Sequence, residues 1–272
     1  MTLEASLATP ASSGPQTGLP EAFGFRNGAN SVHTSRTMML AELGQLFAAT
    51  PQHTHRDRYW AASIHENVLG KRTSVTRKRT VERLTELYGL DPSIPIFRIL
   101  RLLWQADSLG RPMLAGLCAH ARDPLLRQST DFILQVRLGE AVPMDAVCHF
   151  LDGSNPARFR PTTLLSTAQN IASSWTQCGY LEGRRMKKRR RPVVTPTNAT
   201  YALLLAYLAG ARGQSLFSGY WSRLLDCPTD HLTDLAIEAS RRGWMDYRNV
   251  GQVIEVRFPQ LLTAQEREAL HG

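Results

Sequence analysis

A run of basic side chains carries the strongest chemical signal in the sequence, which reads GRRMKKRRRPVVTP from Gly183 to Pro196. Seven of the eight positions from 184 to 191 are Lys or Arg. Clustered cations neutralise phosphates and release counterions, so the run favours binding to nucleic acid. The alternatives are a solvated charge run and a localisation-like tract. The cations are Arg184, Arg185, Lys187, Lys188, Arg189, Arg190 and Arg191.

The excess positive charge is confined to one region of the chain. The 272 residues carry a formal net charge of +9, and the pI is about 9.8. Residues 154–225 hold eleven basic residues and a single acidic one, Glu182, so this segment accounts for the whole excess. Such a charge balance favours an acidic partner but says nothing about the fold.

The segment before the basic run is predicted to be a helix with a polar face that lacks carboxylates. Apolar residues at Leu164, Ala168, Ile171 and Trp175 recur at helical spacing through residues 161–177. Hydroxyl and amide groups on the other face suit contacts with phosphate oxygens and base edges. That face consists of Thr163, Ser166, Thr167, Gln169, Asn170, Ser173, Ser174 and Gln177, with Arg160 just before the helix.

Short extended segments flank the basic run. Residues 180–181 suit the start of a strand, and Val193 and Val194 suit its return, so the run occupies the tip of a predicted hairpin. We therefore predict that this hairpin grips phosphate or a minor groove, while the helix before it lies against the duplex.

A second basic segment, GKRTSVTRKRTVER, spans Gly70 to Arg83. A helix, a glycine turn and a second helix with a basic N-terminal half match a helix-turn-helix. The alternative is a surface helix whose cations are solvated. The candidate contacts in this segment are Lys71, Arg72, Thr73, Ser74, Arg77, Lys78 and Arg79.

The C-terminal part of the chain is predicted to form two helices and a hairpin, which is the layout of a winged helix. Here carboxylates interrupt any positive face, which favours packing or protein contact over DNA binding. The carboxylates are Asp230, Asp234, Glu238, Asp246 and Glu255.

Sequence motifs for catalysis are missing: there is no GxxxxGK[ST], GxGxxG after a strand, GxSxG or HExxH. Asp145, His149 and Asp152 share one face of a predicted helix, and an ordinary exposed face is the simpler interpretation. No metal or cofactor site is expected, and the four cysteines are expected to be reduced thiols. We therefore predict a protein that is not an enzyme.

Helical periodicity dominates after Ser35, and strands are scarce. The predicted fold is mainly α and multi-helical, with helix-turn-helix and winged-helix elements and one or two short β-hairpins. Residues 1–34 are predicted to be disordered, 35–153 to form a helical domain, and 154–272 to form a winged-helix-like region with the basic hairpin. No apolar stretch is long enough for a membrane span, and no signal peptide is evident, so a cytoplasmic location is expected.

Four segments in order resemble the BrxA family, accessory components of BREX bacteriophage-exclusion islands. They are ENVLGKRTSVTRKRTVERL, STDFILQVRLG, AVCHFLDG and a helix that ends in SSWTQCGYLEG. The resemblance covers about residues 35–183 and carries no catalytic residues. It implies a mostly helical DNA-binding protein that works beside other defence proteins, with Lys71 to Arg83 as its basic helix-turn-helix. The basic hairpin and the region after Thr197 depart from the family pattern.

The sequence therefore predicts a protein that binds double-stranded DNA and serves as an accessory factor in phage defence. Two alternatives stay open. The first is an RNA-binding protein of antitermination type, because a basic run alone does not distinguish duplex DNA from structured RNA. The second is a scaffold whose basic surface docks an acidic partner protein.

Overall fold

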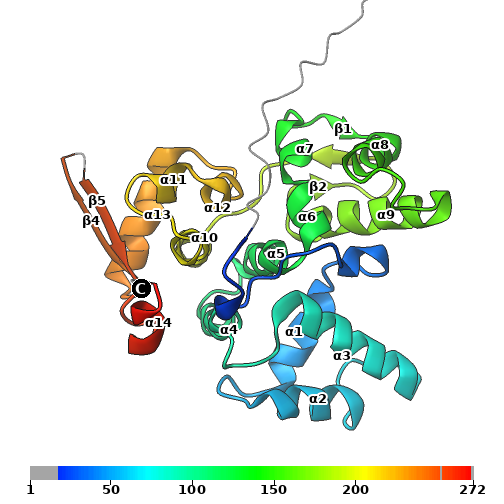
Figure 1. The fold of residues 1–272 in the computed structure, drawn as a ribbon, viewed down its shortest axis with the longest axis horizontal. Coiled ribbons are helices and arrows are strands. Elements are labelled where there is room, and N and C mark those ends of the chain that lie inside the picture. The colour runs from blue at the N-terminus through cyan, green and yellow to red at the C-terminus, as the bar shows by residue number, and fades with distance from the viewer. Residues whose placement is uncertain (1–17, 252, 271–272) are drawn as a thin grey trace, which may run out of the picture.

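The computed structural model describes residues 18–251 and 253–270 (Figure 1). As predicted, the protein is mainly helical, with two small antiparallel sheets of three and two strands. No helix within these ranges is both long and apolar enough to cross a membrane.

The first half of the chain is a helical assembly built around one buried helix. Its helices are α1 (Leu40–Ala49), α2 (Arg56–Ile64), α3 (Ser74–Tyr88), α4 (Pro95–Ala106) and α5 (Arg111–Arg122). Ten of the twelve α5 residues are buried. Small residues let its neighbours approach closely. At Gly116, for example, an added Cβ would lie 2.6 Å from the sulfur of Cys178.

The middle of the chain forms a compact module of helices and a three-stranded sheet. The elements are α6 (Pro124–Gln128), α7 (Thr130–Gln135), β1 (Ala141–Val142), α8 (Met144–Ser154), α9 (Pro161–Gln177), β2 (Leu181–Glu182) and β3 (Lys187–Arg189). The antiparallel sheet has the order β1-β3-β2. A first strand, two helices and a hairpin whose last strand pairs with the first is the arrangement of a winged helix. In that arrangement α9 is the helix that precedes the hairpin, and β2–β3 is the wing.

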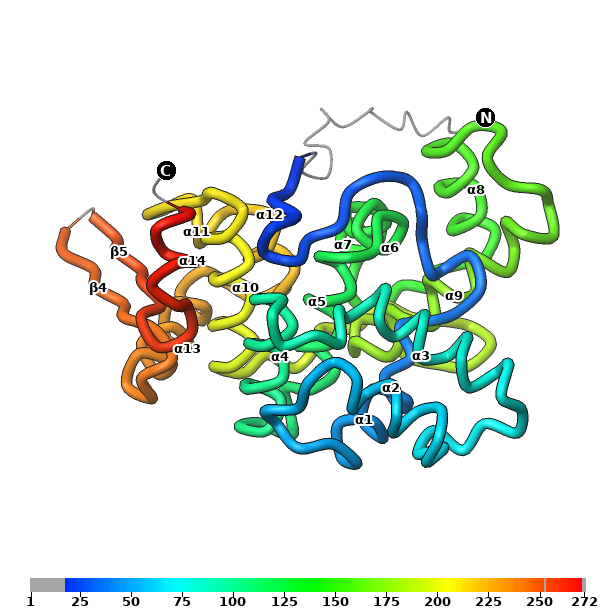
Figure 2. Tube along the Cα trace, turned by 60° about the horizontal axis from the view of Figure 1, so that its bottom comes forward, coloured from blue at the N-terminus to red at the C-terminus, as the bar shows by residue number. Residues whose placement is uncertain are grey.

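The C-terminal part repeats the helix-helix-hairpin order. It contains α10 (Pro196–Leu208), α11 (Ser215–Ser218), α12 (Tyr220–Arg223), α13 (Thr229–Arg241), β4 (Asp246–Val250), β5 (Val253–Arg257) and α14 (Ala264–Glu268). Helix α10 is buried on all sides; its second half, from Tyr201 to Leu208, is apolar or aromatic around the whole helix. The β4–β5 hairpin projects from the body of the molecule in both views (Figures 1 and 2).

Residues 18–34 correct part of the prediction of a disordered N-terminal segment, and residues 1–17 lie outside the described ranges. Residues 21–23 and 32–34 form single 3-10 turns, and the side chains of Leu19, Phe25 and Val32 are buried. The sequence of this segment is polar overall, but its few apolar residues are spaced to reach the core.

The predicted domain boundary between residues 153 and 154 lies at the C-terminal end of α8. The winged-helix module begins earlier, at α6, and one contiguous hydrophobic core joins it to the helical assembly. Helices α6 and α7 meet at Ser129, whose hydroxyl accepts a hydrogen bond from the indole of Trp175 at 2.8 Å.

Candidate nucleic-acid interface

The basic run forms the wing of the module, but the returning strand differs from the prediction: β3 is Lys187–Arg189, inside the run, and Val193 and Val194 form no strand. Leu181 pairs with Arg189 and Glu182 with Lys188, so the tight turn contains Arg184 and Arg185. Both side chains are exposed. Gly183 opens the turn with a φ of 93°, and a Cβ at this position would collide with the carbonyl oxygen of Met186. Glycine therefore permits a turn that places two cations at the end of the wing.

Arg189 is an exception to the prediction that every cation of the run contacts nucleic acid. Its side chain is 2% exposed and donates to the carboxylate of Asp226 at 2.7 Å. It also donates to the backbone carbonyls of Ile133 and Tyr180. Strand alternation turns Arg189 inward and its neighbours outward, so it secures the wing and is removed from the candidate contacts.

Replacing Arg189 by alanine is expected to destabilise the protein by about 3 kcal/mol, because it leaves Asp226 without its cation and empties a buried site. Arg190→Ala is the matched control, since Arg190 is exposed and its contact with Glu182 is 3.7 Å long. The control is expected to change stability by less than about 0.5 kcal/mol. Urea unfolding measures both values, and equal losses would contradict the assignment.

Lys187 connects the wing to α9. Its ammonium group donates to the hydroxyl of Thr176 at 2.9 Å. Partial burial lowers the pKa of Lys187 below its ordinary value. The contact places one face of the wing against the solvent-exposed edge of α9. Because side chains alternate along a strand, Lys188 and Arg190 extend from the face opposite to that of Lys187.

Helix α9 divides its polar residues between two surfaces. Thr167 and Ser174 are buried, and Asn170 and Gln177 bind the backbone of His33 and Leu40. These four serve internal contacts. The remaining polar side chains form a face that we call the α9 open face; it comprises Thr162, Thr163, Ser166, Gln169, Ser173 and Thr176, all exposed or half-buried. Arg160 is exposed just before the helix.

Two exposed apolar side chains adjoin this surface and were not among the predicted contacts. Leu165 on α9 is 46% exposed, and Met186 at the end of the wing is 66% exposed. Apolar side chains contact the thymine methyl group in the major groove, and others insert between base steps in the minor groove. The sequence held a signal for each, because Leu165 lies outside the apolar stripe of α9 and Met186 is the single uncharged residue of the basic run.

A buried polar network fixes α9 to the segment of residues 31–40, which lies between α9 and α3 (Figure 1). The carboxylate of Asp123 accepts from the Ser31 hydroxyl at 2.7 Å and from the Val32 amide at 2.8 Å, and lies 3.1 Å from Nδ1 of His33. Nε2 of His33 is 2.9 Å from the hydroxyl of Ser174. Burial raises the pKa of Asp123, but the charge and hydrogen bond of His33 outweigh burial and hold that pKa well below its ordinary value.

The order Asp123–His33–Ser174 has the connectivity of a nucleophile, base and orienting carboxylate. Its surroundings favour a structural role. All three side chains are buried, and the Ser174 hydroxyl also accepts from the amide of Met38 and donates to the carbonyl of Asn170. The hydroxyl thus lies inside the core, where a substrate has no approach, and its bonds hold α9 in place.

The second predicted surface is arranged differently from a helix-turn-helix. Residues 65–73 join α2 to α3, and this loop is longer than the usual three- or four-residue turn. Thr73 caps α3 by accepting from the amide of Thr76. Lys71 pairs with Glu42 at 3.0 Å, and Arg77 donates to the carbonyls of Lys71 and Ile64. The side chains that stay exposed are Arg72, Thr73, Ser74, Lys78 and Arg79.

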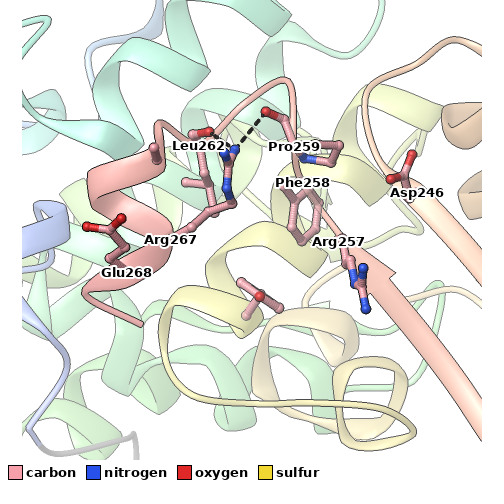
Figure 3. Close-up of a pocket in the computed structure, with 9 residues that line it drawn as sticks. Asp246, Arg257, Phe258, Pro259, Leu262, Arg267 and Glu268 are labelled. Atoms are coloured by element: carbon pink, nitrogen blue, oxygen red, sulfur yellow. Dashed lines mark hydrogen bonds between the residues drawn. The ribbon is translucent and has the colours of Figure 1, made fainter. Parts of the chain in front are cut away.

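A cavity of about 790 Å³ lies beside the C-terminal hairpin, and the two arginines among its lining residues, Arg257 and Arg267, are already engaged (Figure 3). Arg267 donates to the carbonyls of Pro259 and Leu262, and Arg257 pairs with Glu255. Asp246 and Glu268 also line the cavity. The contacts of Arg267 hold α14 against the segment that follows the hairpin, and the use of this region for packing or protein contact stays a prediction.

Comparison with known proteins gives no assignment. No protein-family model matches the sequence, and no curated protein matches it. Within residues 18–251 and 253–270, no group of three or more His, Cys, Asp or Glu side chains is placed to hold a metal ion. Asp145, His149 and Asp152 lie exposed along α8. The site must therefore be interpreted from its own geometry.

Proposed function

We propose that this chain binds double-stranded DNA through the α9 open face and the wing, without catalysing a reaction. The observation that carries the proposal is the sheet order β1-β3-β2 around α8 and α9, with Arg184 and Arg185 at the wing turn. The α9 open face has hydroxyl and amide groups and no carboxylate. A helix of this kind enters a major groove, while the wing cations reach the adjacent backbone.

The geometry favours duplex DNA over duplex RNA. The major groove of B-DNA admits an α-helix, whereas that of A-form RNA is too deep and narrow for side chains to read. The resemblance of residues 35–183 to BrxA-type accessory proteins supports a role in phage defence beside other defence proteins. Arg72, Lys78 and Arg79 on the other basic segment supply a candidate second contact.

The test is binding of the purified protein to random-sequence duplexes of DNA and RNA across a salt series. With about five phosphates neutralised, the log–log salt slope for DNA is expected to be roughly −4 to −5. DNA is expected to bind more tightly than RNA at every salt concentration. Tighter binding of RNA would favour the antitermination-like alternative. Absence of binding to either polymer at low salt would favour an acidic partner protein.

A further inference from the structure

A cavity separate from the wing contains a buried arginine that has no carboxylate partner. The cavity has a volume of about 590 Å³ and lies between residues 52–56, residues 91–93 and the first half of α4. Phe97 and Leu102 supply apolar wall, and Arg101 lines the same space. A volume of this size accommodates a small organic molecule.

The Arg101 guanidinium is only partly satisfied by the protein. The side chain is 2% exposed, and Nη2 donates to the carbonyls of Phe47 at 2.9 Å and Thr50 at 2.6 Å. Nε is buried without a hydrogen-bond partner of normal geometry, as is the hydroxyl of Tyr59. Burial lowers the pKa of Arg101, and the nearby Tyr59 hydroxyl opposes that shift, so the two groups are neighbours. Within the described ranges, no carboxylate forms an ion pair with Arg101. A buried cation without a counter-charge is costly, so the site favours an anion.

Two other buried arginines, Arg122 and Arg189, donate hydrogen bonds from every nitrogen of the guanidinium group. Arg122 donates from Nε, Nη1 and Nη2 to three carbonyls. Arg189 also donates from all three nitrogens and has the carboxylate of Asp226. Arg101 uses only Nη2. Arg122 also lines a cavity, but its three nitrogens are all engaged, so among these three arginines Arg101 is the one that has donors left for a ligand at a cavity wall.

The rim of the cavity strengthens its positive character. Arg56, His53 and His55 are exposed around the opening. The acid at the rim, Asp91, accepts from the amide and hydroxyl of Ser93 and lies 3.9 Å from Arg56. Arg98, also at the cavity, is already paired with Glu266 on α14. A carboxylate that enters thus meets the guanidinium groups of Arg56 and Arg101, and its apolar body meets Phe97 and Leu102.

We propose that this cavity binds a small organic acid, with its carboxylate on Arg101 and its apolar body against Phe97 and Leu102. A guanidinium offers a planar pair of donors that matches a carboxylate. The site is independent of the proposed DNA interface, since it shares no residue with the wing or with α9.

The test compares benzoate with its neutral isostere benzamide and with inorganic phosphate, by calorimetric titration of the full chain. Benzoate is expected to bind with a dissociation constant in the millimolar range or tighter, and at least about tenfold more tightly than either comparison compound, because it alone has both the charge and the apolar body. Equal binding of benzamide would show an apolar pocket only. Equal binding of phosphate would show a nonspecific anion site, and absence of benzoate binding would overturn the proposal outright.

Two variants locate the site. Arg101→Met keeps the length and apolar volume of the side chain and is expected to weaken benzoate binding at least tenfold. Because a buried substitution risks unfolding, Ser93→Trp provides a second test. Ser93 is exposed at the rim, so a large side chain there obstructs the cavity while leaving the core intact. Benzoate affinity unchanged in a folded Ser93→Trp variant would place the ligand elsewhere and contradict the proposal.

Discussion

Replacing the five exposed wing cations by glutamine is expected to weaken binding to duplex DNA by about a hundredfold or more at low salt. The variant combines R184Q, R185Q, K188Q, R190Q and R191Q. It keeps Lys187 and Arg189, whose side chains hold the wing to α9 and to Asp226. Each lost phosphate contact leaves one fewer counterion to release, so the salt slope is expected to fall by about 0.9 per contact. Fluorescence anisotropy with a labelled duplex measures affinity and slope together.

Pairs of substitutions with the same change in charge separate a local contact from a general loss of positive charge. R184Q/R185Q removes the two cations of the wing turn. R241Q/R242Q removes two exposed cations at the end of α13, where Glu238 already pairs with both. Only the first pair is expected to reduce affinity strongly. Equal reductions by the two pairs would mean that net charge, and not the wing, governs binding.

A third pair divides the wing itself. K188Q/R190Q changes the outer face of the strand, which is opposite to the face that Lys187 turns toward α9. On this outer face, Arg190 already lies near Glu182. If α9 enters a groove, the turn lies nearer the duplex than this outer face does. R184Q/R185Q is therefore expected to have a larger effect than K188Q/R190Q. The reverse order would require the duplex to lie along the outer face of the sheet.

Removing the buried carboxylate by Asp123→Ala is expected to destabilise the protein by about 3–5 kcal/mol. The substitution leaves the Ser31 hydroxyl, the Val32 amide and His33 without their shared acceptor, and it removes the N-cap of α6. Buried donors without acceptors account for most of the loss. Urea unfolding at neutral pH measures the effect. Asp152→Ala, on the exposed face of α8, is the control and is expected to change stability by less than about 0.5 kcal/mol.

The Asp123 carboxylate also makes the stability of the protein depend on pH. Because the pKa of Asp123 is lower in the folded protein than in the unfolded chain, its contribution is fully present above about pH 4, the ordinary Asp pKa. It is lost as the pH falls toward the folded-state value. The stability difference between wild type and Asp123→Ala is therefore expected to shrink below pH 4. A difference that stays constant down to pH 3 would contradict the charged state of Asp123.

The sequence predicted the helices of the interface well because their signals are local. The predicted helix 161–177 coincides with α9, and its apolar stripe is the buried face. A hairpin at the basic run was predicted, but its returning strand was expected at Val193 and Val194 and lies at Lys187–Arg189 instead. Strand β1 was not predicted, because two residues offer no alternation to detect, yet this strand completes the sheet and defines the winged helix.

The residues whose roles were not predictable depend on partners far away in the chain. Arg189 has the same local sequence as its neighbours, and only Asp226, 37 residues later, distinguishes it. Ser174 and Gln177 appear as members of a uniform polar face, but the segment of residues 31–40 uses both. In each case tertiary packing, which the local sequence does not reveal, determines whether the side chain faces the protein interior or the solvent.

The network of Asp123, His33 and Ser174 limits how this protein can be divided. His33 and Ser174 are 141 residues apart, and Asp123 precedes the first element of the winged-helix module. A fragment that starts at α6 would therefore retain every predicted DNA contact of the wing while losing both Asp123 and the segment of residues 31–40. Contacts of such sequence separation also form late in folding, because closing long loops is entropically costly. We therefore expect that the winged-helix module does not fold on its own.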